Sequence, residues 1–331
     1  MTYSIYTAKL NKKDEFYTRL EDIEKELFFY RENLKGKVIY CNTDYPSVSS
    51  FWRHFCENFH SLKLKKLVST FRGEFPVKTE YDGSAVTSFL LQDGDFRGKE
   101  CLEILQEADV IVTNPPFSLF REFVSLLRKY GKDFIIIGNT QALAYSSVFR
   151  MFMDGTIRTG YTNFNKGMWF SVPSWYEKYT KEENGKKFVR VSTSCWYTSF
   201  PVKKEFSLES KIRYSPELFP SYHNYDAIHI DNIQNIPCDY NGIMGVPLTF
   251  LDKFDPERFE LLGLSSKGNS ERIPRLHENS YYDGYHRGKV KTRIESNLPI
   301  LAVPDFGGTV CHREGSPDLW QMYWRVFVRR K

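Results

Sequence analysis

Short apolar runs alternate with amphipathic segments along the first half of the chain. β-strands are predicted at Lys37–Cys41, Leu67–Phe71 and Ser88–Leu91, and buried β-strands at Val110–Val112 and Phe134–Ile137. Apolar residues at helical spacing predict helices at Asp14–Leu34, Val48–Phe59, Gly98–Ala108 and Ser118–Tyr130. Alternation of strand and helix from residue 37 to about residue 155 is typical of an α/β fold with a mostly parallel, doubly wound sheet.

The pattern loosens beyond residue 155. Short β-prone runs lie between charged or Gly/Pro-containing turns, at Thr156–Tyr161, Met168–Val172, Phe188–Tyr197 and Asp226–Ile230. The terminal residues 325–331, R-V-F-V-R-R-K, indicate a last strand with a basic tail. We therefore expect residues 1–155 to form a core domain and residues 156–331 to contain the end of its sheet and a second region.

Length and charge add a broad expectation about partners. The chain has 331 residues, enough for about two domains. Its net charge is +5, and residues 271–331 hold 11 Lys and Arg against 7 Asp and Glu, a net +4 that leaves +1 for the rest. This bias suits contact with phosphates, although a solvated basic surface is the commoner cause. Aromatic residues make up 16% of the chain, and mixing them with basic residues is typical both of nucleic-acid surfaces and of hydrophobic cores.

Two classes of protein are disfavoured by the sequence. It contains neither an apolar run of 18 residues nor an amino-terminal signal pattern, so we expect a cytoplasmic protein with no membrane partner. The six cysteines are scattered, without a C-x-x-C motif or a paired spacing with histidine. No metal site is therefore expected.

The segment V-I-V-T-N-P-P-F, residues 110–117, carries the clearest candidate chemistry. Its tetrapeptide follows a predicted strand, and ligands of open α/β sheets bind at the carboxyl ends of strands. The side-chain oxygen of Asn114 and the carbonyl of Pro115 can accept both hydrogens of an aryl amine, which aims the nitrogen lone pair at an electrophile. Pro115 and Pro116 make the loop rigid, and Phe117 offers a flat face for a base. The alternative is an ordinary Asn-Pro turn.

A strand, N-P-P-F, a helix and a second strand in this order resemble the amino-methyltransferases of nucleic acids. Five blocks, one of which contains the N-P-P-F tetrapeptide, make the resemblance specific to the EcoRI-type adenine-specific DNA methyltransferases: D-E-F-Y-T (14–18), D-G-D-F-R (93–97), T-N-P-P-F-S-L-F (113–120), Y-D-A-I (225–228) and P-C-D-Y-N-G-I-M-G-V-P-L-T-F-L-D-K-F (237–254). They span residues 14 to about 262, most of the chain.

That resemblance implies a Rossmann-like doubly wound methyltransferase sheet that ends in an antiparallel pair, followed by a C-terminal α+β target-recognition region. It implies transfer of a methyl group from S-adenosylmethionine to N6 of a flipped-out adenine in double-stranded DNA, as in restriction-modification systems. A monomer is expected, and a cognate restriction endonuclease would share the DNA site without being bound. The alternatives are the same chemistry on cytosine N4, RNA or a glutamine amide, and a non-catalytic nucleic-acid-binding module.

The resemblance also assigns roles to individual residues around the cofactor. Phe16, Tyr17 and Thr18 would contact S-adenosylmethionine, together with Asn114. In the D-G-D-F-R block, Asp95 would accept from the cofactor's adenine amine and Phe96 would pack on the purine, whereas the alternative is a plain D-G turn. An acid after the second strand usually binds the ribose in this fold, and Glu74 is the nearby candidate.

The loop after the first strand departs from the superfamily, because it lacks the usual glycine-rich signature. Asn42 and Asp44 in this loop could still bind the cofactor's amino group and ribose. A helix amino terminus could still face the cofactor's carboxylate. Because it lacks glycine, this loop is expected to approach its ligand differently from the glycine-rich loops of the superfamily.

Contacts with DNA are predicted in two places. Trp169 or Phe170 would supply a second aromatic for the base, although a role in the core explains either residue as well. Alternating cations would share one face of a β-strand and contact phosphates, namely Arg287, Lys289, Lys291 and Arg293. A solvated edge strand protected by its lysines is an equally good explanation.

Overall fold

We analysed a computed structural model of the chain, which describes residues 16–204, 210–266, 269–270, 272–276, 281–286, 289–295, 298–301, 309–312 and 319–331. The chain divides into two compact units, Met1–Lys203 and Lys204–Lys331, and each is described by itself. This places the boundary later than the expected residue 155, because the segment after that residue supplies two strands of the main sheet.

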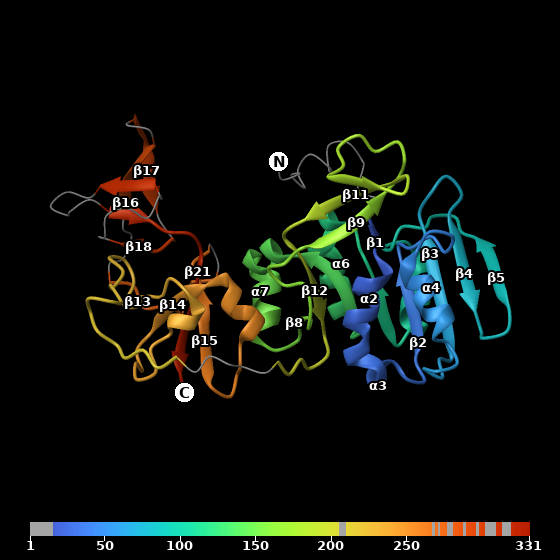
Figure 1. The fold of residues 1–331 in the computed structure, drawn as a ribbon, viewed down its shortest axis with the longest axis horizontal. Helices are drawn as coiled ribbons and strands as arrows, with labels where there is room; N and C mark the ends of the chain where they lie inside the picture. Colours follow the sequence, from blue (N-terminus) through green and yellow to red (C-terminus); the bar gives the residue numbers. More distant parts are fainter. Residues whose placement is uncertain are drawn as a thin grey trace. The chain divides into compact units, whose positions relative to one another are not determined.

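The first unit is built on an eight-stranded mixed sheet with the order β5-β4-β3-β2-β6-β7-β12-β8 (Figure 1). Four central strands are parallel: β3 (Lys66–Phe71), β2 (Val38–Asn42), β6 (Val110–Thr113) and β7 (Asp133–Asn139). Antiparallel strands flank them, with β4 (Val77–Tyr81) and β5 (Val86–Leu90) on one side and β12 (Ser194–Thr198) and β8 (Arg158–Thr159) on the other. The α/β class and the closing antiparallel pair are therefore confirmed.

One edge of this sheet differs from the expectation. The run predicted at Ser88–Leu91 is strand β5, and it forms an antiparallel hairpin with β4, a strand that the sequence analysis missed. Every residue of β5 is exposed, and this run is an antiparallel edge strand instead of part of the expected parallel sheet. The doubly wound parallel part is thus limited to the four central strands.

Helices connect and cover the strands of the first unit. They are α2 (Leu20–Leu27), η1 (Phe28–Tyr30), α3 (Arg31–Leu34), α4 (Ser50–Glu57), α5 (Lys99–Glu107), η2 (Phe117–Leu119), α6 (Phe120–Lys129), η3 (Thr140–Ala144) and α7 (Ser146–Met153). In α6, Phe120, Phe123 and Leu127 are buried, as their spacing of three and four residues predicts. Strand β6 is buried along its whole length, which fixes the loop after it at a rigid point of the core.

The helix predicted at Asp14–Leu34 begins later, at Leu20. Its described first part is strand β1 (Tyr17–Thr18), which pairs with β9 (Met168–Val172), and residues 14 and 15 lie outside the described residues. Strand β9 also pairs with β11 (Lys186–Val191), which pairs with β10 (Lys181–Glu183). This small sheet has the order β1-β9-β11-β10 (Figure 1). The run Phe188–Tyr197 is accordingly divided between β11 and β12.

The second unit contains two sheets. The first has the order β13-β14-β21-β15, formed by Ile228–His229, Met244–Pro247, Arg325–Arg330 and Phe259–Leu264. The second has the order β17-β16-β19-β20-β18, formed by Lys289–Glu295, Tyr281–His286, Thr309–His312, Leu319–Gln321 and Ile300–Leu301. Two short 3-10 helices, η4 (Ile233–Asn235) and η5 (Leu248–Lys253), complete it, and no α-helix occurs among its described residues. The regular structure among its described residues is therefore mainly β-strand.

The predicted terminal strand is confirmed as β21, which lies between β14 and β15 and is followed by Lys331 alone. Within the described ranges, no helix is long and apolar enough to cross a bilayer.

Candidate functional site

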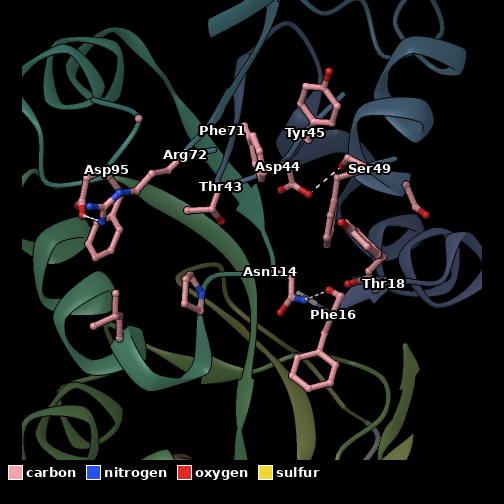
Figure 2. A pocket seen from close by; sticks show the side chains of 17 residues that line it. Phe16, Thr18, Thr43, Asp44, Tyr45, Ser49, Phe71, Arg72, Asp95 and Asn114 are labelled. Atoms are coloured by element: carbon pink, nitrogen blue, oxygen red, sulfur yellow. Dashed lines mark hydrogen bonds and ion pairs between the residues drawn. The ribbon is translucent and has the colours of Figure 1, made fainter. Parts of the chain in front are cut away.

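A cavity of about 240 Å³ opens at the carboxyl ends of the parallel strands in the first unit. It is lined by Phe16, Tyr17, Thr18, Thr43, Asp44, Tyr45, Ser49, Ser50, Phe51, Phe71, Arg72, Gly94, Asp95, Phe96, Asn114, Pro116 and Leu119. These residues come from strand β1 and the residue before it, the end of β3, the start of α4, the helix η2, and the loops that follow β2, β3, β5 and β6. Figure 2 shows the cavity between Asp95 at one end and Asn114, Phe16 and Thr18 at the other.

Asn114 follows β6 directly, and its carboxamide has a defined orientation. The Nδ2 atom donates a hydrogen bond of 2.7 Å to the backbone carbonyl of Phe16 (Figure 2). The Oδ1 atom is buried and has no hydrogen-bond partner. Because buried acceptors are normally satisfied, an unpaired one in a cavity wall points to a missing donor. Thr18 adds a second such atom to the same wall, its buried Oγ1.

Aromatic rings pack together beside Asn114. The Phe16 and Phe117 rings are stacked, with centroids 6.1 Å apart and planes 20° from parallel. Phe170 meets both rings edge-on, at centroid distances of 5.8 Å from Phe16 and 6.1 Å from Phe117. Phe170 is fully buried, so it belongs to the core that supports these rings. Phe117 itself is half-buried and does not line the cavity.

The loop after β2 reaches the cavity without glycine. Thr43 adopts a left-handed backbone with φ of +66°, a conformation that glycine usually supplies. Asp44 accepts hydrogen bonds from Ser49 Oγ at 2.8 Å and from Thr113 Oγ1 at 2.6 Å. Burial raises the pKa of Asp44 from 3.8 to about 6, and the two hydroxyl donors oppose that shift. A cation bound beside Asp44 would therefore be strongly favoured.

Asp95 is held by arginines at the other end of the cavity. Arg97 donates from Nε and from its backbone N–H to Oδ1, both at 2.9 Å, and from a terminal nitrogen to Oδ2 at 2.8 Å. Arg72 donates to Oδ2 at 2.5 Å. The Arg97 side-chain hydrogen bonds, above all, lower the pKa of Asp95 to about 2. Both carboxylate oxygens already accept two hydrogen bonds, so a ligand amine can bond to Asp95 only if an arginine releases it.

The cavity brings together most of the predicted cofactor residues. Phe16, Tyr17, Thr18, Asp44, Asp95, Phe96 and Asn114 all line it, and so does Pro116 of the predicted catalytic set. Asn42 and Pro115 are buried but are not lining residues, and the exposed Glu74 lies outside the cavity wall. Arg72 occupies the wall after β3, where an acid was expected.

Sequence reasoning missed several lining residues, among them Thr43, Tyr45, Ser49, Phe71 and Arg72. Ser49 carried the clearest signal, because a serine before an amphipathic helix is a typical N-cap, and its Oγ accepts from the Trp52 N–H at 3.2 Å. The signal for Tyr45 and Phe71 was weaker, because their aromatic rings come together only in the folded chain, with centroids 5.1 Å apart.

The predicted DNA contacts fall in other places. Trp169 lies in β9 next to Phe170, on the opposite face of the small sheet from the aromatic rings around Phe117. The segment 285–293, predicted as one basic strand, is instead divided between the antiparallel strands β16 and β17, whose pairing register shifts between Gly284 and Tyr285. Lys289, Lys291 and Arg293 belong to β17, and Arg287 lies outside the described residues.

The described part of the chain holds no group of three or more His, Cys, Asp or Glu side chains placed to bind a metal ion.

Comparisons with known proteins identify the family of this chain. The family model described as "Adenine-specific methyltransferase EcoRI" matches residues 4–88 and 78–331. Type II methyltransferase M.EcoRI of Escherichia coli is 40% identical, over 78% of this chain and 88% of that one. Type II methyltransferase M.MgeORF184P of Mycoplasma genitalium is 38% identical, over 77% and 84%, and Type II methyltransferase M.MpnI of Mycoplasma pneumoniae is 35% identical, over 84% and 91%.

Solved structures add nothing to this comparison. YeaZ from Pseudomonas aeruginosa matches 43% of this chain and 72% of its own, with 10% identity and a TM-score of 0.17. A likeness of that degree carries no argument.

Proposed function

The chain belongs to the adenine-specific methyltransferase EcoRI family, and we propose that it transfers a methyl group from S-adenosylmethionine to N6 of a flipped-out adenine in double-stranded DNA. In this proposal the main sheet is the Rossmann-like methyltransferase sheet, and the second unit contains the target-recognition region. The protein would act as a monomer and without a bound endonuclease, as the modification enzyme of a restriction-modification system.

The orientation of Asn114 is the observation that carries the proposal. An adenine amino group offers two hydrogens and needs two acceptors that leave its lone pair free. Asn114 meets this need because its donor is already bonded to Phe16, so the carboxamide presents an unpaired oxygen. If the Asn114 carboxamide were flipped, its nitrogen would face the cavity and repel the amine. The hydrogen bond from Nδ2 to the Phe16 carbonyl disfavours that flipped orientation.

The cavity residues suit the proposed cofactor. Asp44 supplies a carboxylate for its ammonium group, and the amino terminus of α4, capped by Ser49, suits its carboxylate. The rings of Tyr45 and Phe71 provide apolar surface for the adenine near Arg72. When bound, S-adenosylmethionine supplies a methyl group already activated as a sulfonium.

The protein's own part in the reaction is orientation. Asn114 Oδ1 and the Pro115 carbonyl would accept the two amino hydrogens, which makes the nitrogen pyramidal and directs its lone pair toward the methyl carbon. As the new N–C bond forms and the C–S bond breaks, the nitrogen gains positive charge, which these two acceptors stabilise. One of the two amino hydrogens then leaves as a proton. Phe117 would stack on the extruded base. Because one face of the Phe117 ring already stacks on Phe16, the base would either displace the Phe16 ring or stack on the other face of Phe117.

The experiment is transfer of labelled methyl groups to separate pools of DNA, RNA and protein. We expect label in DNA, and N6-methyladenine after hydrolysis of that DNA to nucleosides. Label confined to RNA or protein, or N4-methylcytosine as the product, would refute the proposed substrate. Expression in a methylation-free host, followed by mapping of modified bases in its genome, would then give the recognition sequence.

A further inference from the structure

The small sheet β1-β9-β11-β10 has an inner face packed in the hydrophobic core of the first unit and an opposite, outer face. On the inner face, Phe170 pairs with Thr18 and with Val189, and all three are buried. The residues of the outer face follow from the register and the alternation of side chains. This outer face comprises Tyr17, Trp169, Ser171, Lys181, Glu183, Lys186, Phe188 and Arg190.

Cations and aromatic rings alternate across this outer face. The Lys181 Nζ atom lies 4.6 Å from the centre of the Trp169 ring and 5.5 Å from that of Phe188. Arg190 lies opposite Trp169 in the register and donates to the Lys166 carbonyl at 3.0 Å. The mixture of flat rings and cations is the one that proteins use to hold nucleic-acid strands.

The outer face is also positively charged. It carries three cations against one carboxylate, and that carboxylate, Glu183, pairs with Lys181 at 2.8 Å. Lys186 and Arg190 are exposed, and neither forms an ion pair with any residue that the structure describes. Two exposed cations without counter-ions are therefore available to an anionic partner.

The position of the face relates it to the cavity. Tyr17, at one edge of the sheet, both lines the cavity and pairs with Ser171. Neighbouring strands lie about 4.8 Å apart, so Arg190, two strands away, lies roughly 10 Å from that rim. Duplex DNA carries one phosphate charge per about 1.7 Å of its axis. A duplex with one base in the cavity therefore has phosphates close to this rim.

We propose that the outer face of the small sheet binds the DNA backbone beside the flipped adenine, with Lys186 and Arg190 contacting phosphates. The inference rests on the proposed function and adds to it a DNA-binding surface within the catalytic unit. Trp169 then serves as a surface contact that holds Lys181 in place, instead of stacking on the target base.

The test compares DNA affinity across salt concentrations by fluorescence anisotropy with a labelled duplex. The variant Lys186→Ala/Arg190→Ala removes the two cations, and Lys65→Ala/Lys129→Ala is a control of equal charge. Lys65 immediately precedes β3 and Lys129 ends α6 shortly before β7, so both control positions lie toward the amino ends of the parallel strands, away from the cavity at their carboxyl ends. S-adenosylmethionine affinity and thermal melting are measured for every protein to establish that the cavity and fold are retained.

We expect the slope of log affinity against log salt to fall by about 2 in the Lys186/Arg190 variant and to be unchanged in the control. Equal slopes for the Lys186/Arg190 variant and the wild type, with a wild type that methylates DNA, would overturn this surface and leave the proposed function standing. A wild-type protein that neither binds nor methylates DNA would instead refute the proposed function.

Discussion

Asn114 and Phe16, 98 residues apart in the sequence, are joined by a 2.7 Å hydrogen bond from the Asn114 side chain to the Phe16 carbonyl. The bond links the loop after β6 to the short strand β1, whose Tyr17 and Thr18 line the same cavity. A residue proposed to hold the acceptor amine is thereby oriented by the segment proposed to contact the methyl donor.

Cofactor affinity should depend on the ionisation of Asp44. Its pKa is raised to about 6 by burial, and an ammonium group binds the ionised form. Affinity for S-adenosylmethionine should therefore fall about tenfold for each pH unit below 6 and level off above it. Calorimetry at several pH values measures this dependence. Asp44→Asn should bind more weakly and lose the dependence, whereas an identical pH profile in the variant would exclude Asp44 from cofactor binding.

The raised pKa of Asp44 also predicts how the stability of the ligand-free protein depends on pH. Because the folded-state pKa lies above the ordinary 3.8, folding favours the protonated carboxyl. This contribution is complete below about pH 3.8 and is lost as the pH rises through 6. Urea unfolding of Asp44→Asn should lack that decline. If the free energy of unfolding declined equally with pH in the variant and the wild type, the decline would come from a titratable group other than Asp44.

Glu26 should be important for stability although it lies outside the cavity. Its buried carboxylate accepts from the backbone N–H groups of Tyr161 and Thr162, from Thr162 Oγ1 and from the Tyr30 hydroxyl. Glu26→Gln presents an amide N–H₂ to some of these donors, so we expect the free energy of unfolding to fall by about 2–4 kcal/mol. Denaturant unfolding measures it, with the exposed Glu24→Gln as control. A loss no larger than that of the control would contradict this network.

Gly94 should be required for an open cavity. A Cβ atom at this position would lie 2.4 Å from the Phe71 carbonyl oxygen, a backbone atom that cannot rotate away. Gly94→Ala must therefore displace the end of β3 or the loop that holds Asp95, and we expect cofactor affinity to fall by at least about tenfold, or 1.4 kcal/mol. Calorimetry provides the measurement, and unchanged affinity in a folded variant would show that the cofactor binds elsewhere.

The central part of the fold could be predicted from local sequence. The run Val110–Val112 has only apolar residues, the N-P-P-F tetrapeptide cannot continue a strand, and Phe120, Phe123 and Leu127 repeat at helical spacing. Each of these signals acts within a few residues. The structure confirms the strand, the loop at its carboxyl end and the helix that follows.

The features that the sequence did not predict depend on long-range pairing. Phe16 continues the apolar stripe of Ile23 and Leu27, yet it precedes the helix because the next residue, Tyr17, pairs with Ser171. Arg72 could not be assigned to the cavity, since its place in the wall depends on a carboxylate 23 residues later. Such long-range contacts produce no periodic pattern of residues in the sequence.

The most direct test of the proposed mechanism compares methyl transfer and cofactor binding in Asn114→Ala. Labelled methyl transfer to DNA and calorimetry with S-adenosylmethionine are measured on the same preparation. We predict that transfer falls by at least about 100-fold, as when a single transition-state contact is removed, while cofactor affinity changes by less than about tenfold. Near-normal transfer by this variant would contradict the assignment of Asn114 as the residue that holds the amine.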